Sequence, residues 1–423
     1  MQFHFSRNIL TWISYLSIIS IMKKRTLLPY IKNASENFPV VLVSGPRQVG
    51  KTTIFDIAID KKRTKVSLDD ENAMVLATTD PVAFFEQYSP PVLIDEVQYA
   101  PQLFKQIKIL SDKYNKNGLF WLTGSQVFSM MKNVSETLAG RIAILNLQGF
   151  SQSEILDKSK VEPFIPKMMK TRQGYKLTTQ SAFENIWKGS FPRYRTSPKM
   201  NWKMFYSSYV KTYLERDVRQ ILNISQERTF YQFLKVLAAR TAQLVNYNDI
   251  ARDLDITSKT VKAWISILET SGIIFHLHPY SNNLTKRAIK TPKLYFFDTG
   301  LVAYLTGQDS AEIISNGPMS GAILENYAIS EIFKSYWHNA EEISAYYYRD
   351  KDGYEIDLII ESEGRLYPVE IKRTSSPSKA DIKNFTIMEK FGRDIGMGAV
   401  ICLRETPILL NSNVISVPLN YIS

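Results

Sequence analysis

The sequence predicts an α/β protein with several domains: a parallel sheet with helices, then a mostly helical stretch, then a small α/β domain. Apolar runs within 39–45, 91–98 and 118–126 each end in small, polar or acidic residues, as buried parallel strands do. Residues 150–230 have a helical and basic character, and short strand-like runs joined by turn sequences occupy 345–373. The 423 residues suffice for two or three such domains.

Composition is that of a soluble globular protein, with 44% hydrophobic and 22% charged residues. The net charge of +11 favours a polyanionic partner, nucleic acid before membrane. Cys402 is the only cysteine, which excludes an internal disulfide and a cysteine-based zinc site. A single cysteine fits a reducing compartment, so we expect a cytoplasmic protein.

The amino terminus carries an apolar run, residues 9–22, between Arg7 and a basic triplet at 23–25. It is shorter than the roughly 20 residues that a membrane span needs, and no small-residue cleavage site follows it. Two interpretations stay open: translation starts at Met22, which we favour, or the run is a peripheral membrane helix. We therefore treat 1–21 as an extension outside the fold.

The segment GPRQVGKT at 45–52 matches the phosphate-binding pattern GxxxxGK[ST] without a mismatch. A strand precedes it and a helix follows, which is the context the pattern requires. Glycines let backbone N–H groups curl around phosphate oxygens, and the helix amino terminus adds positive charge. The expected nucleotide-binding residues are Gly45, Pro46, Arg47, Gln48, Val49, Gly50, Lys51, Thr52 and Thr53. Lys51 would reach the β- and γ-phosphates of ATP, and the Thr52 hydroxyl would bind Mg²⁺.

A second strand, VLI within 91–98, ends in Asp95 and Glu96. Asp95 is placed to hold Mg²⁺ through water, and Glu96 to polarise the attacking water. This order of acids indicates hydrolysis rather than binding alone.

Two further residues are candidates for the hydrolytic site. Ser125, or its neighbour Gln126, follows the third strand, where it could sense the γ-phosphate or the attacking water. Arg141 could neutralise the charge that develops on the transferred phosphoryl group, either in its own subunit or in a neighbouring one. The alternative for Arg141 is a surface arginine before an edge strand.

The segments GPRQVGKTT, LIDEVQ, LTGSQ and LAGR, in this order, resemble a large group of bacterial and archaeal AAA-superfamily ATPases. These proteins pair an amino-terminal ATPase domain with a carboxyl-terminal domain of uncertain function. The resemblance covers nearly the whole chain from Met22. It implies that residues 45–53 bind ATP, that Asp95 and Glu96 are the Walker B acids, and that Ser125 lies at the sensor position.

Basic and aromatic residues interleave in the segment 161–230, which we interpret as a helical linker or lid. The cations are Arg193, Arg195, Lys199, Lys203 and Lys211, and the aromatic residues are Phe191, Tyr194, Trp202, Phe205 and Tyr206. Such a set can stack bases and contact phosphates, or it can be an amphipathic helix with a solvated basic face.

Residues 244–280 read as helix, turn, helix and strand, the order of a winged-helix segment. We expect helix caps at Asn246 or Asn248 and at Thr257 or Ser258. The stripe Val261, Ile265 and Leu268 would face the core, leaving Lys259, Lys262 and Ser266 exposed. The following wing carries Lys286, Arg287, Lys290 and Lys293, which could lie along a DNA backbone; packing on the ATPase or on a partner protein is the alternative.

The last third of the chain resembles the metal-dependent PD-(D/E)xK nuclease core. Glu325 lies on a predicted helix, Asp357 on a strand, and Glu370 and Lys372 share one face of the next strand. The carboxylates are hard oxygen ligands, so Asp357 and Glu370, with Glu325, could hold a second Mg²⁺ or Mn²⁺. Lys372 would position the nucleophile. The alternative is a domain whose acids and lysine pair with each other.

Together these features predict an ATPase that acts on or binds DNA, with a possible metal-dependent nuclease. The alternative is an ATP-driven interaction module with an inactive nuclease-like domain. A homo-oligomer and a protein partner are both compatible with the sequence. The expected divisions are an extension at 1–21, an AAA-type P-loop domain at 22–160, the basic linker at 161–230, a winged helix at 231–300, and a small restriction-endonuclease-like α/β domain at 301–423.

Overall fold

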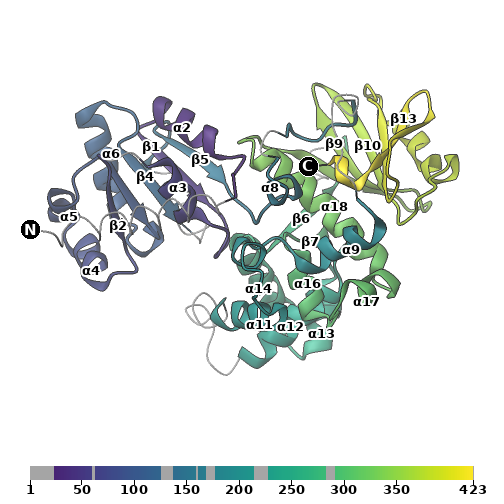
Figure 1. Cartoon of the computed structure of the whole chain (residues 1–423), viewed down its shortest axis with the longest axis horizontal. Helices are drawn as coiled ribbons and strands as arrows, with labels where there is room; N and C mark the ends of the chain where they lie inside the picture. The colour runs from purple at the N-terminus through teal and green to yellow at the C-terminus, as the bar shows by residue number, and fades with distance from the viewer. Residues whose placement is uncertain are drawn as a thin grey trace, which may run out of the picture.

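The computed structural model describes residues 23–59, 62–124, 137–158, 161–167, 177–213, 227–282 and 291–422. Two sheets dominate it. One is formed by the first third of the chain, and the other by the last third with a hairpin from the middle. A group of helices lies between and below them in Figure 1.

The first sheet is parallel, with strand order β2-β3-β4-β1-β5. Its strands are β1 (Val40–Ser44), β2 (Thr64–Ser67), β3 (Val92–Asp95), β4 (Phe120–Gly124) and β5 (Ile142–Asn146). The three predicted apolar runs are β1, β3 and β4. Every residue of β1 and β4 is buried, because helices cover both faces of the sheet.

The helices of this part are α2 (Leu28–Asn37), α3 (Lys51–Ala58), α4 (Glu71–Thr79), α5 (Pro81–Gln87) and α6 (Leu103–Tyr114), with the short turn η1 (Val97–Tyr99). The helix predicted after the phosphate-binding pattern is α3. Its apolar residues Ile54 and Phe55 are buried, and Phe55 stacks on Trp121 of β4 at 4.9 Å. This packing fixes the start of α3 beside the carboxyl end of β1.

The middle of the chain contains α8 (Gln152–Ile155), α9 (Thr179–Lys188), α10 (Pro192–Arg195) and α11 (Trp202–Tyr213). The prediction that its aromatic residues could stack bases is wrong. Phe191, Trp202, Phe205 and Tyr206 are buried and pack on one another, so their rings are core.

Two of the cations in this segment that could have contacted nucleic acid already bind groups of the protein itself. The guanidinium of Arg195 donates to the carbonyls of Gly189 and Asn185, at 2.6 and 2.9 Å. Lys203 pairs with Asp309 at 2.6 Å. Arg193, Lys199 and Lys211 are exposed.

Three helices follow: α12 (Glu227–Ala239), α13 (Tyr247–Leu254) and α14 (Ser258–Thr270). Asn246 caps α13, and Thr257 caps α14, where its hydroxyl accepts from the N–H of Thr260. The predicted stripe of α14 (Val261, Ile265, Leu268) is buried, and its other face, with Lys259, Lys262 and Ser266, is largely exposed. The two helices, their caps and the buried stripe therefore lie where the sequence predicts them, and the winged-helix assignment stays a prediction.

The predicted wing is not a free hairpin. Strand β6 (Ile274–Pro279) pairs antiparallel with β7 (Lys293–Phe296) and parallel with β8 (Ser344–Arg349), so both strands join the edge of the carboxyl-terminal sheet. Lys293 is consequently buried at 4% exposure and is not available to a DNA backbone. Lys286, Arg287 and Lys290 lie outside the described residues. The expected domain boundary at 300/301 would separate β6 and β7 from the other strands of this sheet, so the boundary does not fall there.

The second sheet has eight strands in the order β12-β13-β11-β10-β9-β8-β6-β7. Its further strands are β9 (Glu355–Ser362), β10 (Arg365–Ile371), β11 (Gly398–Cys402), β12 (Ile408–Asn411) and β13 (Val414–Pro418). Strands β8, β9 and β10 form the two predicted hairpins. Helices α16 (Thr299–Leu305), α17 (Ala311–Asn316) and α18 (Ser320–Trp337), with η5 (Lys379–Phe391) and η6 (Leu419–Tyr421), complete this part.

No helix in the described ranges has the length and apolarity needed to cross a membrane. The apolar run at 9–22 lies outside those ranges, so the two interpretations of it stay predictions.

Candidate functional site

The phosphate-binding pattern forms a tight loop between β1 and α3. A side chain at Gly45 would place its Cβ 1.9 Å from the carbonyl oxygen of Leu147, so only glycine fits there. Gly50 has a φ of +91°, in the left-handed region that favours glycine. Both glycines of the pattern are thus required by the backbone path, which turns the chain directly into α3.

Lys51, the first residue of α3, folds back over the loop. Its Nζ donates to the carbonyl oxygens of Gly45 and Pro46, at 2.9 and 2.8 Å. The side chain is buried at 6% exposure, and these acceptors are neutral. An anion in the loop could take over such bonds, because a charged acceptor binds an ammonium more strongly than a carbonyl does.

Thr52, the second residue of α3, lies next to Asp95, the last residue of β3. The Thr52 hydroxyl donates to both Asp95 carboxylate oxygens, at 2.9 and 3.1 Å. The hydroxyl of Thr123, from β4, also donates to Asp95. A hydroxyl beside a carboxylate is a suitable pair of hard oxygen ligands, directly or through water, for the Mg²⁺ that accompanies ATP.

Glu96 leaves β3 with a positive φ of 56°, held by a bond from its N–H to the Thr123 hydroxyl at 3.0 Å. Its carboxylate accepts from the Gln98 amide and lies 3.9 Å from the Arg47 guanidinium. This turn aims Glu96 away from the strand, into the space in front of the loop.

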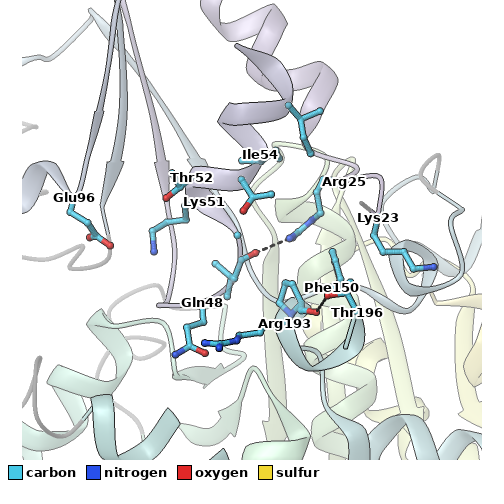
Figure 2. Close-up of a pocket in the computed structure, with 15 residues that line it drawn as sticks. Lys23, Arg25, Gln48, Lys51, Thr52, Ile54, Glu96, Phe150, Arg193 and Thr196 are labelled. Atoms are coloured by element: carbon cyan, nitrogen blue, oxygen red, sulfur yellow. Dashed lines mark hydrogen bonds between the residues drawn. The ribbon is translucent and has the colours of Figure 1, made fainter. Parts of the chain in front are cut away.

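A cavity of about 530 Å³ lies in front of the loop (Figure 2). One wall is the loop with α3 and Glu96; the other carries Lys23, Arg25, Phe150, Arg193 and Thr196. The cavity therefore combines the backbone of the loop, one acid, Glu96, and cations from other parts of the chain.

Arg25 joins the two walls. Its guanidinium donates to the carbonyls of Val49 and Gln148, at 2.8 and 2.7 Å, and to the Glu154 carboxylate at 3.1 Å. Burial acts to raise the pKa of Glu154, but Arg25 and His338 hold it well below its usual range. Glu154 is thus an anion that fixes Arg25 against the loop, and Arg25 is a structural cation.

Arg193, for which the sequence left open contact with nucleic acid or a solvated face, lies on α10 in the wall of this cavity. Its side chain is exposed, and it has no ion-pair partner among the described residues. Nothing local in the sequence distinguishes it from the neighbouring cations, because its position depends on how α10 packs against the loop.

Arg141 is in the wrong place to act on its own subunit's loop. It directly precedes β5, which runs parallel to β1 with Ile142 opposite Val40, whereas the loop follows Ser44. The two ends of the sheet are about 16 Å apart at ~3.3 Å per residue. Arg141 instead pairs with Asp112 of α6 at 2.6 Å. Ser125 and Gln126 lie outside the described residues.

The four residues of the nuclease-like pattern do come together. Glu325 of α18, Asp357 of β9, Glu370 of β10 and Lys372, which directly follows β10, surround one region beside the sheet. Lys372 binds Glu370 at 2.6 Å, and Asp357 accepts from the N–H of Ile371 at 2.9 Å.

Sequence reasoning missed three further members of this cluster. Lys293 lies 2.8 Å from Glu355 and 3.3 Å from Glu325, and the Tyr295 hydroxyl donates to Glu325 at 2.6 Å. Lys293 and Tyr295 belong to β7, and Glu355 begins β9. Their partners are 30 or more residues away, so no local pattern could have identified them.

Burial and the Asp357 charge raise the pKa of Glu370 to about 8, although Lys372 acts in the opposite direction. The same two causes raise the pKa of Glu325 to about 7. At neutral pH the raised pKa favours the protonated form of Glu370 and leaves Glu325 partly protonated, because burial and the nearby Asp357 disfavour further negative charge.

The cluster does not fit the expected second metal. One Glu370 oxygen is buried with no hydrogen-bond partner in the described structure, which alone would suit a cation. However, the remaining carboxylates converge on Lys293, and the part of the chain that the structure describes has no group of three or more His, Cys, Asp or Glu arranged to hold a metal ion.

Three family models match successive parts of the chain. A family described as an AAA domain matches residues 37–156. Two families described as domains of unknown function, DUF8612 and DUF4143, match 179–312 and 320–422. Uncharacterized proteins of Mycobacterium bovis and Mycobacterium tuberculosis are each 27% identical to this chain over 405 residues, which covers 95% of this chain and 85% of the relative.

Among solved structures, the RuvB Holliday junction branch migration motor of Thermotoga maritima is similar at 18% identity and a TM-score of 0.27, over 59% of this chain and 86% of that one. A DNA replication initiation factor is similar at 14% identity and a TM-score of 0.28, over 68% of this chain and 92% of that one. TM-scores this low do not establish a shared fold. The match to the AAA domain, by contrast, coincides with the parallel sheet and its phosphate-binding loop, so residues 37–156 form an AAA-type domain.

Proposed function

We propose that the protein binds ATP with Mg²⁺ in the cavity in front of the loop and hydrolyses it. The observation that carries the proposal is the meeting of three groups at one cavity edge: the loop of α3, the Thr52–Asp95 pair and the carboxylate of Glu96. Backbone N–H groups at the start of α3 would bind the phosphates, and Lys51 would exchange its two carbonyl acceptors for phosphate oxygens.

The other side chains have separate roles in this proposal. Thr52 and Asp95 would hold Mg²⁺, which supplies positive charge to the phosphate oxygens when it is bound. Glu96 would orient and polarise the attacking water. Arg193 would meet the charge that develops on the transferred group, in place of Arg141.

ATP turnover and nucleotide binding in two variants test this proposal. Lys51→Ala should abolish binding or turnover, because the loop loses the ammonium whose two carbonyl acceptors the phosphate oxygens would replace. Glu96→Gln should retain binding and block turnover, since it keeps the shape of the side chain and removes the charge. Unchanged turnover in both variants would reject the proposal.

We propose a second function, contact with DNA, on a narrower basis. The exposed face of α14 carries Lys259, Lys262 and Ser266 on a helix-turn-helix, in a chain of net charge +11. The buried aromatic residues of 191–206 and the buried Lys293 take no part in it.

The test is ATP turnover with and without double-stranded DNA at low and moderate salt. Stimulation that fades with salt would support phosphate contacts. Turnover that ignores DNA at every salt concentration would reject DNA contact and leave a protein partner as the alternative. Arg141, partly exposed at the far end of the sheet, is left for a role in the site of a neighbouring subunit, which requires an oligomer that the native mass would reveal.

A further inference from the structure

Lys293 occupies an unusual place for a lysine. It starts β7, a strand at the edge of the second sheet, and its side chain is buried at 5% exposure. Its ammonium lies 2.8 Å from Glu355, 3.3 Å from Glu325 and 4.0 Å from Asp357. Three carboxylates from α18 and β9 therefore converge on one internal cation.

Such an arrangement is maintained only if the charges compensate each other, because a buried unpaired charge is strongly unfavourable. Burial acts to lower the pKa of Lys293, but Glu325, Asp357 and Glu355 raise it well above its usual range, so the lysine stays charged. Conversely, without the ammonium the three carboxylates would repel one another, and two of them, Glu325 and Asp357, are largely buried.

We propose that Lys293 is the built-in counter-ion of the carboxyl-terminal acidic cluster, in the place where its nuclease-like pattern would put a divalent metal. The lysine opposes metal binding because its ammonium already pairs with Glu325 and lies 4.0 Å from Asp357, two of the carboxylates that a hard cation would use. It also ties β7, which follows the helix-turn-helix, to α18 and β9. The cluster is thus a charged clamp between the middle and the last third of the chain.

The first experiment measures Mn²⁺ binding by electron paramagnetic resonance, without nucleotide, so that the ATP site does not contribute. The full-length wild type should bind no stoichiometric Mn²⁺, and neither Mn²⁺ nor EDTA should change its Tm. One Mn²⁺ bound per wild-type chain, lost in Asp357→Asn, would overturn the proposal.

The second experiment uses Lys293→Met, which keeps the side-chain length and removes the charge. We expect its Tm to fall by about 10 °C, and Mn²⁺ to bind and restore part of the loss. The matched control is Lys372→Met, the other lysine of the cluster, which is 38% exposed and pairs with Glu370 alone. It should gain no Mn²⁺ binding. A folded Lys293→Met chain with unchanged Tm and no Mn²⁺ binding would contradict the role of Lys293.

If Lys293→Met alone does not fold, a double-mutant cycle with Glu355→Gln still tests the proposal. The pair Lys293→Met and Glu355→Gln removes one charge of each sign, so the double variant should melt at a higher temperature than Lys293→Met alone. A double variant that is no more stable than the single one would show that the lysine does not compensate these carboxylates.

Discussion

The proposed ATP site and the acidic cluster contain the same kinds of residue, a buried lysine with nearby acids, yet they differ in what the lysine binds. Lys51 and Lys293 are almost equally buried, at 6% and 4% exposure. Lys51 donates to two neutral carbonyls of its own loop, beside an open cavity, whereas Lys293 binds carboxylates from two other elements. Burial of a lysine alone therefore does not distinguish a ligand-binding role from a structural one. The distinction lies in whether the ammonium binds neutral carbonyls, which a ligand could replace, or carboxylates of the protein.

Replacing each lysine in a separate variant gives the largest expected difference between the two sites. Lys51→Met should lower ATP turnover by at least about 100-fold, as removal of a charge that stabilises a transition state does, with a Tm within about 2 °C of wild type. Lys293→Met should do the reverse: a lower Tm but normal turnover per folded molecule. Turnover assays and thermal melts of both variants measure this. A Lys293→Met chain that is stable but inactive would break the comparison.

The second largest effect concerns two arginines. Arg141 is the candidate that the sequence offered for the hydrolytic site, and Arg193 is the one that lines the cavity. Arg193→Ala should lower the turnover number by roughly 10- to 100-fold, because Arg193 lines the cavity and is free to meet developing charge. Arg141→Ala is the matched control, since it removes the same group from the far end of the sheet. Measured in dilute protein, Arg141→Ala should stay within about twofold of wild type. Equal losses in both would point to a site shared between subunits.

The pH dependence of stability distinguishes the cluster from the ATP site. The pKa of Glu370 is raised to about 8, so the native state binds this proton more tightly than the unfolded state does. Its stabilising contribution is complete below the ordinary pKa of 4.5 and is lost as the pH rises through about 8. Glu370→Gln should therefore gain a few degrees of Tm relative to wild type between pH 5 and pH 9. A constant difference in Tm across this range would exclude the expected titration.

The smallest expected effect concerns the exposed face of α14. If this face contacts DNA, Lys259→Ala combined with Lys262→Ala should reduce the slope of log affinity against log salt by about 2, and leave the Tm nearly unchanged. The control is Lys105→Ala with Lys108→Ala on α6, which makes the same change in net charge on an exposed face of the AAA-type domain. Equal losses in both double variants would indicate a general charge effect rather than a binding face.

Much of the first sheet was predictable because buried parallel strands are continuous apolar runs, and both glycines of the loop have a backbone reason to be glycine. The caps Asn246 and Thr257 were predictable for a similar, local reason. The distance of Arg141 from its own loop also had a signal in the sequence: a residue that precedes a parallel strand lies at the opposite end from a loop that follows one.

What could not be predicted depends on contacts between distant segments. An aromatic stripe has the same spacing whether it packs in a core, as Phe205 and Tyr206 do, or stacks on bases. The pairing of β6 with β8 joins residues about 70 positions apart and converts the expected wing into a sheet edge. Lys293 became part of the acidic cluster only through that pairing, so its partners were not visible in its own neighbourhood.

The most direct test of the contrast between the two sites is the number of Mn²⁺ ions bound per wild-type chain, with and without a non-hydrolysable ATP analogue. We expect no bound Mn²⁺ ion without the nucleotide and one with it. Thr52 and Asp95 would bind the metal together with phosphate, whereas Lys293 prevents the acidic cluster from binding one. An ion bound without nucleotide and removed by Asp357→Asn, or a second ion in the presence of nucleotide, would contradict it.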